Sequence, residues 1–300
     1  MSTEDKDPRF ADIDSWPTIE AVDAMLEEQI AALASVRSQV AAIAVAAEAA
    51  AARLSRSGRL IYAGAGTSGR IAVQDGVELE PTYGWPHERL LFVMAGGSIA
   101  LTESVEGAED DADAGRSAVI EHGVGPDDVV IGVAASGRTP FTVALLEEAR
   151  LAGALTIAVA NNPATPLLAI SEFPIVASTG AEVIAGSTRM KAGTAQKAIL
   201  NMLSTSVMLR AGLVYKGFMV SMRISNDKLR RRGEAIVREL TGADTQTVTR
   251  SLEQGALDIR KAVLIASGVE PSTAARLLDA SGGDLRKAIA RSQAGVDAHA

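Results

Sequence analysis

Short apolar runs of strand length alternate with helical patterns through the centre of the chain. Five such runs end in small or polar residues, and they read RLIYAGAG, LLFVMAGG, DDVVIGVAAS, LTIAVANN and EFPIVAST. Between the third and fourth runs, residues 139–153 carry apolar positions at helical spacing and stop at Gly153. Continuous apolar strands that alternate with helices are typical of a parallel sheet covered on both faces. The pattern predicts a doubly wound α/β domain over residues 51–215.

A long helical pattern precedes this domain and forms a predicted N-terminal segment over residues 1–50. From about Ile19 to Leu54 the chain consists almost entirely of helix formers. Apolar residues recur there three and four positions apart, namely Met25, Ile30, Leu33, Val36, Val40, Ile43 and Val45. Thr18 is the expected N-cap, because Glu20 and Glu27 follow it with negative charge. We predict a long helix or helix pair whose alanine-rich face needs a partner surface.

The end of the chain is also predicted to be helical. Residues 188–212 carry a long helical pattern, and after about Asp227 no strand signal remains. We expect a small all-helical domain of two to four helices over residues 216–300.

Composition and charge narrow the class of protein. A hydrophobic fraction of 47% in 300 residues supplies enough apolar material for a core, which argues against disorder. The net charge of −8 lacks the basic surface expected for binding nucleic acid or anionic lipid. The acidic start resembles no signal peptide, and we see no uninterrupted apolar run of about 18 residues for a membrane span. We therefore expect a cytoplasmic protein with no nucleic-acid or membrane partner.

Metal chemistry is not expected either. The chain has no cysteine, which excludes disulfides, thiolate catalysis and cysteine-ligated metal. Its three histidines, His87, His122 and His299, are too scattered to form a recognisable metal motif.

A glycine-rich loop after the first predicted strand suggests a bound phosphate. Residues 64–69 match the G-x-G-x-x-G pattern of dinucleotide sites. Such sites need an acidic residue about 20 positions on, at the end of the next strand, but that strand ends in Gly96 and Gly97. We therefore expect no nicotinamide or flavin cofactor. A plain strand-to-helix turn stays open as an alternative, but Thr67 and Ser68 place hydroxyls where free N–H groups of a helix N-terminus hold phosphate.

Two later loops repeat this design. Residues 135–140 read Ala-Ser-Gly-Arg-Thr-Pro, and residues 186–191 open another helix with hydroxyls and basic side chains. Loops at the carboxyl ends of parallel strands are the usual ligand sites of such sheets. We therefore expect a phosphorylated small molecule, bound by Gly66, Thr67, Ser68, Ser136, Gly137, Thr139, Ser187 and Lys191.

Several motifs resemble one known family. GAGTSGR, AASGRTP and GAEVIAGSTRMKAGTAQK are similar to the sugar isomerase (SIS) domain and, within that superfamily, to the N-acetylmuramic acid 6-phosphate etherases. VEGAEDD and NMLSTSVMLRAG resemble the same family, and the likeness covers roughly residues 50–240. The resemblance implies a Rossmann-like SIS fold, a homodimer and a cytoplasmic role in peptidoglycan recycling. It also implies a lyase that releases D-lactate and N-acetylglucosamine 6-phosphate without a metal or redox cofactor.

The resemblance further implies two catalytic glutamates. The family's acid aligns with Glu78 in DGVELEPTYG, and its second catalytic glutamate aligns with Glu109 in EGAEDD. Elimination of lactate requires removal of the C2 proton and protonation of the leaving oxygen, which two carboxyl groups in different protonation states provide. By charge pattern alone, both are ordinary surface carboxylates. The family usually reads Glu-Cys-Pro-Pro where this chain reads Glu-Leu-Glu-Pro, so Glu80 is an alternative acid.

Two other functions use the same scaffold. An aldose–ketose isomerase also places a glutamate at C2 of a phosphosugar, so Glu78 alone does not exclude that reaction. A non-catalytic phosphosugar-sensing regulator keeps the phosphate loops and loses the carboxylates. The presence of both Glu78 and Glu109 within family motifs favours the etherase.

Overall fold

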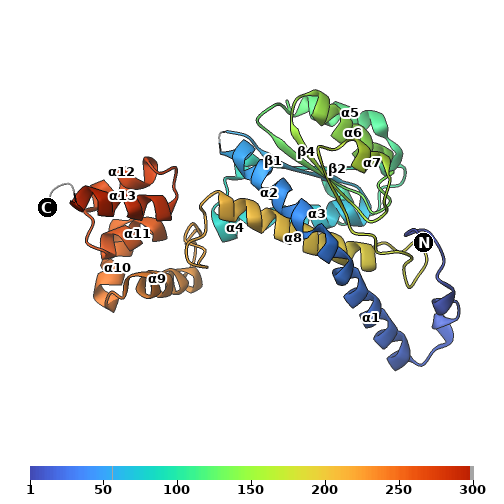
Figure 1. Cartoon of the computed structure of the whole chain (residues 1–300), viewed down its shortest axis with the longest axis horizontal. Helices are drawn as coiled ribbons and strands as arrows, with labels where there is room; N and C mark the ends of the chain where they lie inside the picture. Colours follow the sequence, from blue (N-terminus) through green and yellow to red (C-terminus); the bar gives the residue numbers. More distant parts are fainter. Residues whose placement is uncertain (56, 298–300) are drawn as a thin grey trace. The chain divides into compact units, whose positions relative to one another are not determined.

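The computed structural model describes residues 1–55 and 57–297, which form two compact units. The first unit combines residues 1–76 and 88–207 and contains the sheet with its N-terminal helices. The second combines residues 77–87 with the chain from residue 208 onward and is helical (Figure 1).

A parallel sheet is the centre of the first unit. Its strands are β1 (Leu60–Gly64), β2 (Leu90–Met94), β3 (Val129–Val133), β4 (Leu155–Ala160) and β5 (Phe173–Val176). Their order is β2-β1-β3-β4-β5, and all four pairings are parallel. This confirms the doubly wound sheet, and each of the five apolar runs forms one strand. The winding reverses between β1 and β3, which is the point where sheets of this kind bind ligands.

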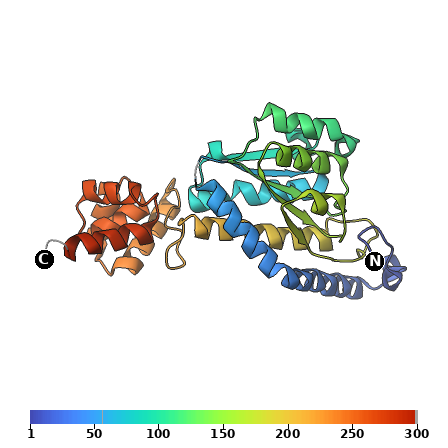
Figure 2. The ribbon, with the colours of Figure 1, turned by 45° about the horizontal axis from the view of Figure 1, so that its top comes forward.

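Helices cover both faces of the sheet (Figures 1 and 2). One face carries α5 (Ala112–Glu121), α6 (Pro140–Leu151) and α7 (Pro166–Ile170), whose apolar side chains share one core with the strands. The other face carries α2 (Val40–Leu54), α3 (Gly66–Val77) and α8 (Lys191–Arg210). Because helices lie on both sides, every residue of β1, β3 and β4 is buried, as continuous apolar strands require.

A buried polar cluster fixes α3 against the sheet. The Tyr62 hydroxyl on β1 donates to Asp75 Oδ2 on α3 at 2.8 Å, and Asn201 Nδ2 on α8 donates to Asp75 Oδ1 at 2.5 Å. Burial, reinforced by the Asp75 carboxylate, raises the pKa of the Tyr62 hydroxyl well above its usual value. The phenol therefore stays protonated and remains a donor, which holds the helix that begins at the glycine-rich loop.

The N-terminal segment contains two helices. Helix α1 (Thr18–Val36) continues through a 3-10 turn at Arg37–Gln39 into α2. Thr18 is the first helical residue and Pro17 occupies the N-cap, so the prediction of Thr18 as N-cap was wrong by one position. Further 3-10 turns lie at Pro8–Phe10, Ile13–Ser15, His87–Arg89, Ser98–Leu101 and Ala108–Asp110.

The apolar stripe of α1 and α2 is largely uncovered within the chain. Residues that are 49% to 76% exposed include Ile19, Val22, Leu26, Ile30, Leu33, Val40 and Val45. By length and composition alone, the helical run Thr18–Leu54 passes as a membrane span, contrary to the expectation that the chain holds no such run. That test is passed equally by apolar helices that pack against protein, so it leaves open what covers the stripe.

The second unit packs several short helices around a core of its own. After α4 (Leu79–Tyr83), the described residues form α9 (Asp227–Thr241), α10 (Thr245–Gln254), α11 (Ile259–Ala266), α12 (Pro271–Asp279) and α13 (Leu285–Asp297). Five helices thus replace the predicted two to four. Each is 8 to 15 residues long, and the side chains of Asn226, Asp244, Asp258 and Glu270 cap four of them.

Candidate functional site

The loop after β1 leads directly into α3. Only Ala65 separates the end of β1 from Gly66, the first residue of the helix. A side chain on Gly69 would begin 2.9 Å from the Gly64 carbonyl carbon, so the close approach of helix and strand requires glycine. The first turn of α3 therefore presents backbone N–H groups of residues 66–68 that have no acceptor within the helix.

The loop after β3 is built in the same way. It ends at Thr139, the N-cap of α6, whose side chain makes no capping hydrogen bond. Gly137 has a φ of +65°, and a side chain there would begin 2.3 Å from Thr165 Oγ1. Ser136 Oγ accepts from the Arg138 backbone N–H at 3.1 Å, which leaves its own proton available for a ligand.

Both loops open into one cavity of about 410 Å³ at the β1–β3 switch point. Predicted phosphate ligands that line it are Gly66, Thr67, Ser68, Ser136 and Thr139. Further lining residues are Glu4, Ala65, Glu109, Asp110, Ala135, Arg138, Pro140, Gly186 and Thr188. Hydroxyls and two helix N-termini therefore meet in one place, which is the combination that holds a phosphate.

The remaining three predicted ligands lie elsewhere. Gly137 shapes its loop without lining the cavity, and Thr188 lines the cavity in place of its neighbour Ser187. Lys191 is 5% exposed, and its ammonium donates to the Glu28 carboxylate and to the Ala181 carbonyl. The structure therefore does not support Lys191 as a phosphate ligand.

The N-terminus of α8 is also occupied, by the chain's own carboxylate. The backbone N–H groups of Lys191 and Ala192 both donate to the fully buried Glu182 side chain at 2.9 Å. Burial raises the pKa of the Glu182 carboxyl, although these two amide hydrogen bonds oppose the shift. The third loop thus resembles the other two in sequence, but its helix N-terminus already holds a carboxylate.

Lys191 has a structural role that can be measured. We expect Lys191→Met to lower the free energy of unfolding by about 3 kcal/mol, because a buried carboxylate loses a partner. Among the described residues, Arg9 at 3.0 Å would then be the remaining cation paired with Glu28. The matched control is Lys197→Met on the same helix, since that ammonium makes an exposed hydrogen bond to Asn201 and no ion pair within the described part of the chain. Urea denaturation that gave equal stabilities for the two variants would contradict this role.

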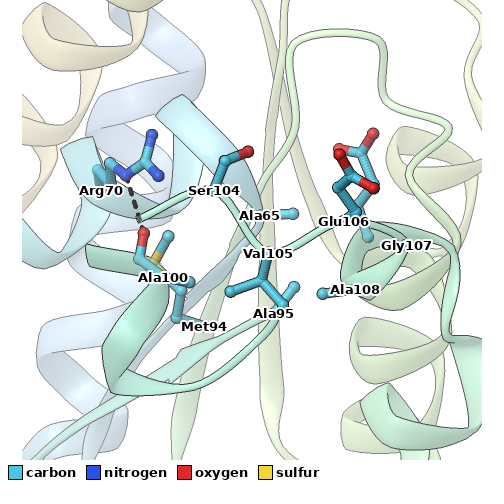
Figure 3. Close-up of a pocket in the computed structure, with 12 residues that line it drawn as sticks. Ala65, Arg70, Met94, Ala95, Ala100, Ser104, Val105, Glu106, Gly107 and Ala108 are labelled. Atoms are coloured by element: carbon cyan, nitrogen blue, oxygen red, sulfur yellow. Dashed lines mark hydrogen bonds between the residues drawn. The ribbon is translucent and has the colours of Figure 1, made fainter. Parts of the chain in front are cut away.

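Glu109 lies on the border of two cavities. A second cavity of about 330 Å³ shares Ala65, Gly66 and Glu109 with the first. Arg70 and Ser104 lie on one side of it and Glu106 lies across from them (Figure 3). The Glu109 side chain is thus common to the lining of both cavities.

Arg70 lines the second cavity and also supports this segment. Its guanidinium donates to the carbonyls of Ala100 and Glu103 at 2.9 and 2.8 Å. The chain that leads to Glu109 is therefore tied to α3.

Glu78 and Glu80 belong to the second unit and differ in their partners. Glu78 is exposed at the N-cap of α4, and its side chain makes none of the hydrogen bonds or ion pairs found among the described residues. Glu80 forms an ion pair with Arg223 at 3.2 Å. Of the two carboxylates, only Glu80 therefore has an ion-pair partner among the described residues.

Glu4 lines the cavity although no sequence pattern predicted it there. Its polar segment has no periodicity and precedes the glycine-rich loop by about sixty residues. Its place depends on a contact between Thr3 and Asn162, which no local pattern encodes. No group of three or more metal-ligating side chains occurs within the described residues, and His299 lies outside them.

Comparison with known proteins identifies the relatives of this chain. A model of the glucokinase regulatory protein N-terminal SIS domain matches residues 42–150, and the SIS domain model matches residues 114–206. The chain is 42% identical to an N-acetylmuramic acid 6-phosphate etherase of Deinococcus radiodurans, over 97% of this chain and 96% of that protein. It is 46% identical to the protein of that name from Symbiobacterium thermophilum, over 88% of each.

A solved structure supports the fold. It is described as a phosphosugar isomerase involved in capsule formation in Bacteroides fragilis, and it is 21% identical with a TM-score of 0.52. The match covers 67% of this chain and 95% of that one.

Proposed function

The chain belongs to the N-acetylmuramic acid 6-phosphate etherase family, and from this we propose that it cleaves the D-lactyl ether of N-acetylmuramic acid 6-phosphate. The products are D-lactate and N-acetylglucosamine 6-phosphate, so the enzyme is a carbon–oxygen lyase. The observation that supports this is the hydroxyl-lined cavity between two helix N-termini with Glu109 at its border. An etherase needs both the phosphate site and the carboxylate.

The proposed reaction is an elimination followed by addition of water. With the sugar ring open, the aldehyde acidifies the hydrogen on C2. Glu109 removes this proton, the C3–O bond breaks, and lactate leaves with a proton from Glu78. Water then adds to the unsaturated aldehyde, with its oxygen on C3 and a hydrogen on C2. Each positioned proton transfer typically contributes about 10²–10⁴ in rate.

Hydroxyl groups of the two loops are proposed to bind the phosphate. We expect Ser136→Ala to raise the KM for N-acetylmuramic acid 6-phosphate by about 10- to 100-fold, because a hydrogen bond to a charged group contributes about 1.5–3 kcal/mol. Ser68→Ala and Thr139→Ala act in the same direction. Ser187→Ala is the matched control, since Ser187 does not line the cavity. An unchanged KM in the first three variants removes this phosphate site from the proposal.

The exposed apolar stripe of α1 and α2 supports a homodimer. An apolar groove of about 470 Å³ continues the stripe between α2 and α8, and it is lined by Val40, Ile43, Ala44, Asn201, Met202, Thr205 and Ser206. Apolar surface of this extent on a folded unit indicates an interaction site, and a second copy covers it by symmetry. We expect light scattering at micromolar concentration to give twice the chain mass. A monomeric mass contradicts the homodimer.

The homodimer is also proposed to complete the catalytic site. Gly66 and Gly76, both in the first unit, are about 15 Å apart along this helix, and Glu78 follows two residues later. We infer that a second copy supplies Glu78 to the cavity that holds Glu109. Mixed dimers of Glu78→Gln and Glu109→Gln subunits should then regain activity, because one of their two sites contains both glutamates. Mixing that restores nothing contradicts the shared site.

Two alternatives remain distinguishable by their products. A phosphosugar isomerase would interconvert an aldose and a ketose, and a sensor would bind phosphosugar without turnover. Neither releases lactate.

We place the enzyme in the cytoplasm, where phosphorylated sugars are retained.

A further inference from the structure

Thr3 anchors the N-terminal segment next to the phosphate loops. It is fully buried, although it is the third residue of the chain. Its backbone N–H donates to Asn162 Oδ1 at 3.0 Å, and its hydroxyl accepts from Asn162 Nδ2 at 2.8 Å. The same Nδ2 donates to the Ala135 carbonyl at 3.0 Å, directly before Ser136. The Asn162 side chain therefore joins the N-terminal segment to the loop after β3.

A second anchor follows six residues later. Arg9 pairs with the buried Asp7 at 2.7 Å and with Glu28 on α1 at 3.0 Å. Glu28 in turn holds Lys191 at the start of α8. The segment between Thr3 and Arg9 is thus fixed at both ends, and Glu4 lies within it.

The Glu4 carboxylate faces the cavity with one oxygen free. Its Oε1 accepts from the Thr3 hydroxyl at 3.1 Å, which continues the chain of donors from Asn162. Its Oε2 lies beside Gly186, another lining residue. The distance from this oxygen to the position that a Cβ atom on Gly186 would occupy is 3.8 Å. No cation pairs with Glu4 within the described part of the chain. An unpaired carboxylate near a phosphate site repels an anionic ligand unless the ligand gives it hydrogen bonds.

We propose that Glu4 binds the sugar of the substrate by accepting hydrogen bonds from its hydroxyl groups. An ionised carboxylate only accepts hydrogen bonds. The phosphate and the lactyl carboxylate are themselves acceptors, whereas the hydroxyls of the open-chain sugar are donors that match Glu4. This inference rests on the proposed function and assigns a binding residue that holds the sugar chain once its phosphate is in the loops.

Because the substrate is an anion, the two possible roles of Glu4 change KM in opposite directions when its charge is removed. Glu4→Gln keeps the size of the side chain and the acceptor for Thr3, but removes the negative charge. If Glu4 binds hydroxyls, the KM for N-acetylmuramic acid 6-phosphate rises about 10- to 100-fold, since a charge-assisted hydrogen bond is lost. If Glu4 is a bystander, the variant lowers KM or leaves it unchanged, because repulsion of an anionic substrate is reduced. That second result overturns the inference.

Asp5→Asn is the matched control. It removes the same charge one position away, keeps an acceptor for the Ser2 backbone N–H, and lies outside the cavity lining. Its KM should stay within about twofold of the native value. An equal rise of KM in both variants shows a general charge effect and also overturns the inference.

Two further measurements separate binding from folding. Inorganic phosphate occupies only the loops, so its inhibition constant should be unchanged or lower in Glu4→Gln. A marked rise shows that the loops themselves were disturbed.

Thr3→Val, which removes the donor to Glu4, should raise KM with little change in kcat, and Thr3→Ser should restore the native KM. A native KM in Thr3→Val contradicts the role of the anchor.

The inference and the proposed function fail in different ways. Lactate release by Glu4→Gln with a native KM removes Glu4 from the site and leaves the etherase intact. The absence of lactate release from the native protein removes the proposed function itself.

Discussion

Replacing Glu109 by glutamine lowers kcat about 10²–10⁴-fold and suppresses exchange of the C2 proton with solvent, if this carboxylate is the base. Glutamine keeps the shape of the side chain but cannot take up the proton. In the proposed site the loops after β1 and β3 bind the phosphate and Glu109 does not, so KM should change little. The measurement is deuterium incorporation at C2, followed by mass spectrometry in deuterated water.

Asp110→Asn tests whether this role belongs to Glu109 alone. Asp110 lies next to Glu109 and also lines the cavity that holds the predicted phosphate ligands. It should retain C2 exchange and most of the turnover. If Asp110→Asn loses C2 exchange while Glu109→Gln keeps native exchange, the base is Asp110 and the assignment to Glu109 is wrong.

Replacing Glu78 by glutamine separates elimination from exchange. Because only the proton for the leaving oxygen is lost, lactate release slows about 10²–10⁴-fold while C2 exchange continues. Glu80→Gln should have a much smaller effect, since Glu80 pairs with Arg223, whereas Glu78 has no ion pair among the residues that the structure describes. The comparison requires rates of lactate release and of C2 exchange for both variants. The reverse pattern assigns the acid to Glu80.

Local patterns predicted the fold because the fold depends on them. Apolar runs such as LTIAVA in β4 are buried at every position, which only a covered parallel strand allows. Local geometry requires glycine in the loops after β1 and β3, because Gly69 lies against Gly64 and Gly137 has a positive φ. Five of the predicted phosphate ligands consequently line one cavity.

Contacts between residues far apart in the chain decide the rest. Lys191 resembles a phosphate ligand next to Ser187 and Thr188, yet its partner Glu28 lies 163 positions earlier. The position of Glu4 depends on the bond between Thr3 and Asn162, which are 159 positions apart. Spacing within a motif contains no information on such partners, so the sequence could not predict the Lys191–Glu28 contact or the place of Glu4 in the cavity lining.

The most direct test of the account uses labelled water. The purified protein is incubated with N-acetylmuramic acid 6-phosphate in water enriched in oxygen-18, and both products are analysed by mass spectrometry. Elimination breaks the C3–O bond, so D-lactate should be released without label and N-acetylglucosamine 6-phosphate should carry oxygen-18 on C3. Label in the lactate, or no lactate at all, contradicts cleavage by elimination at this site.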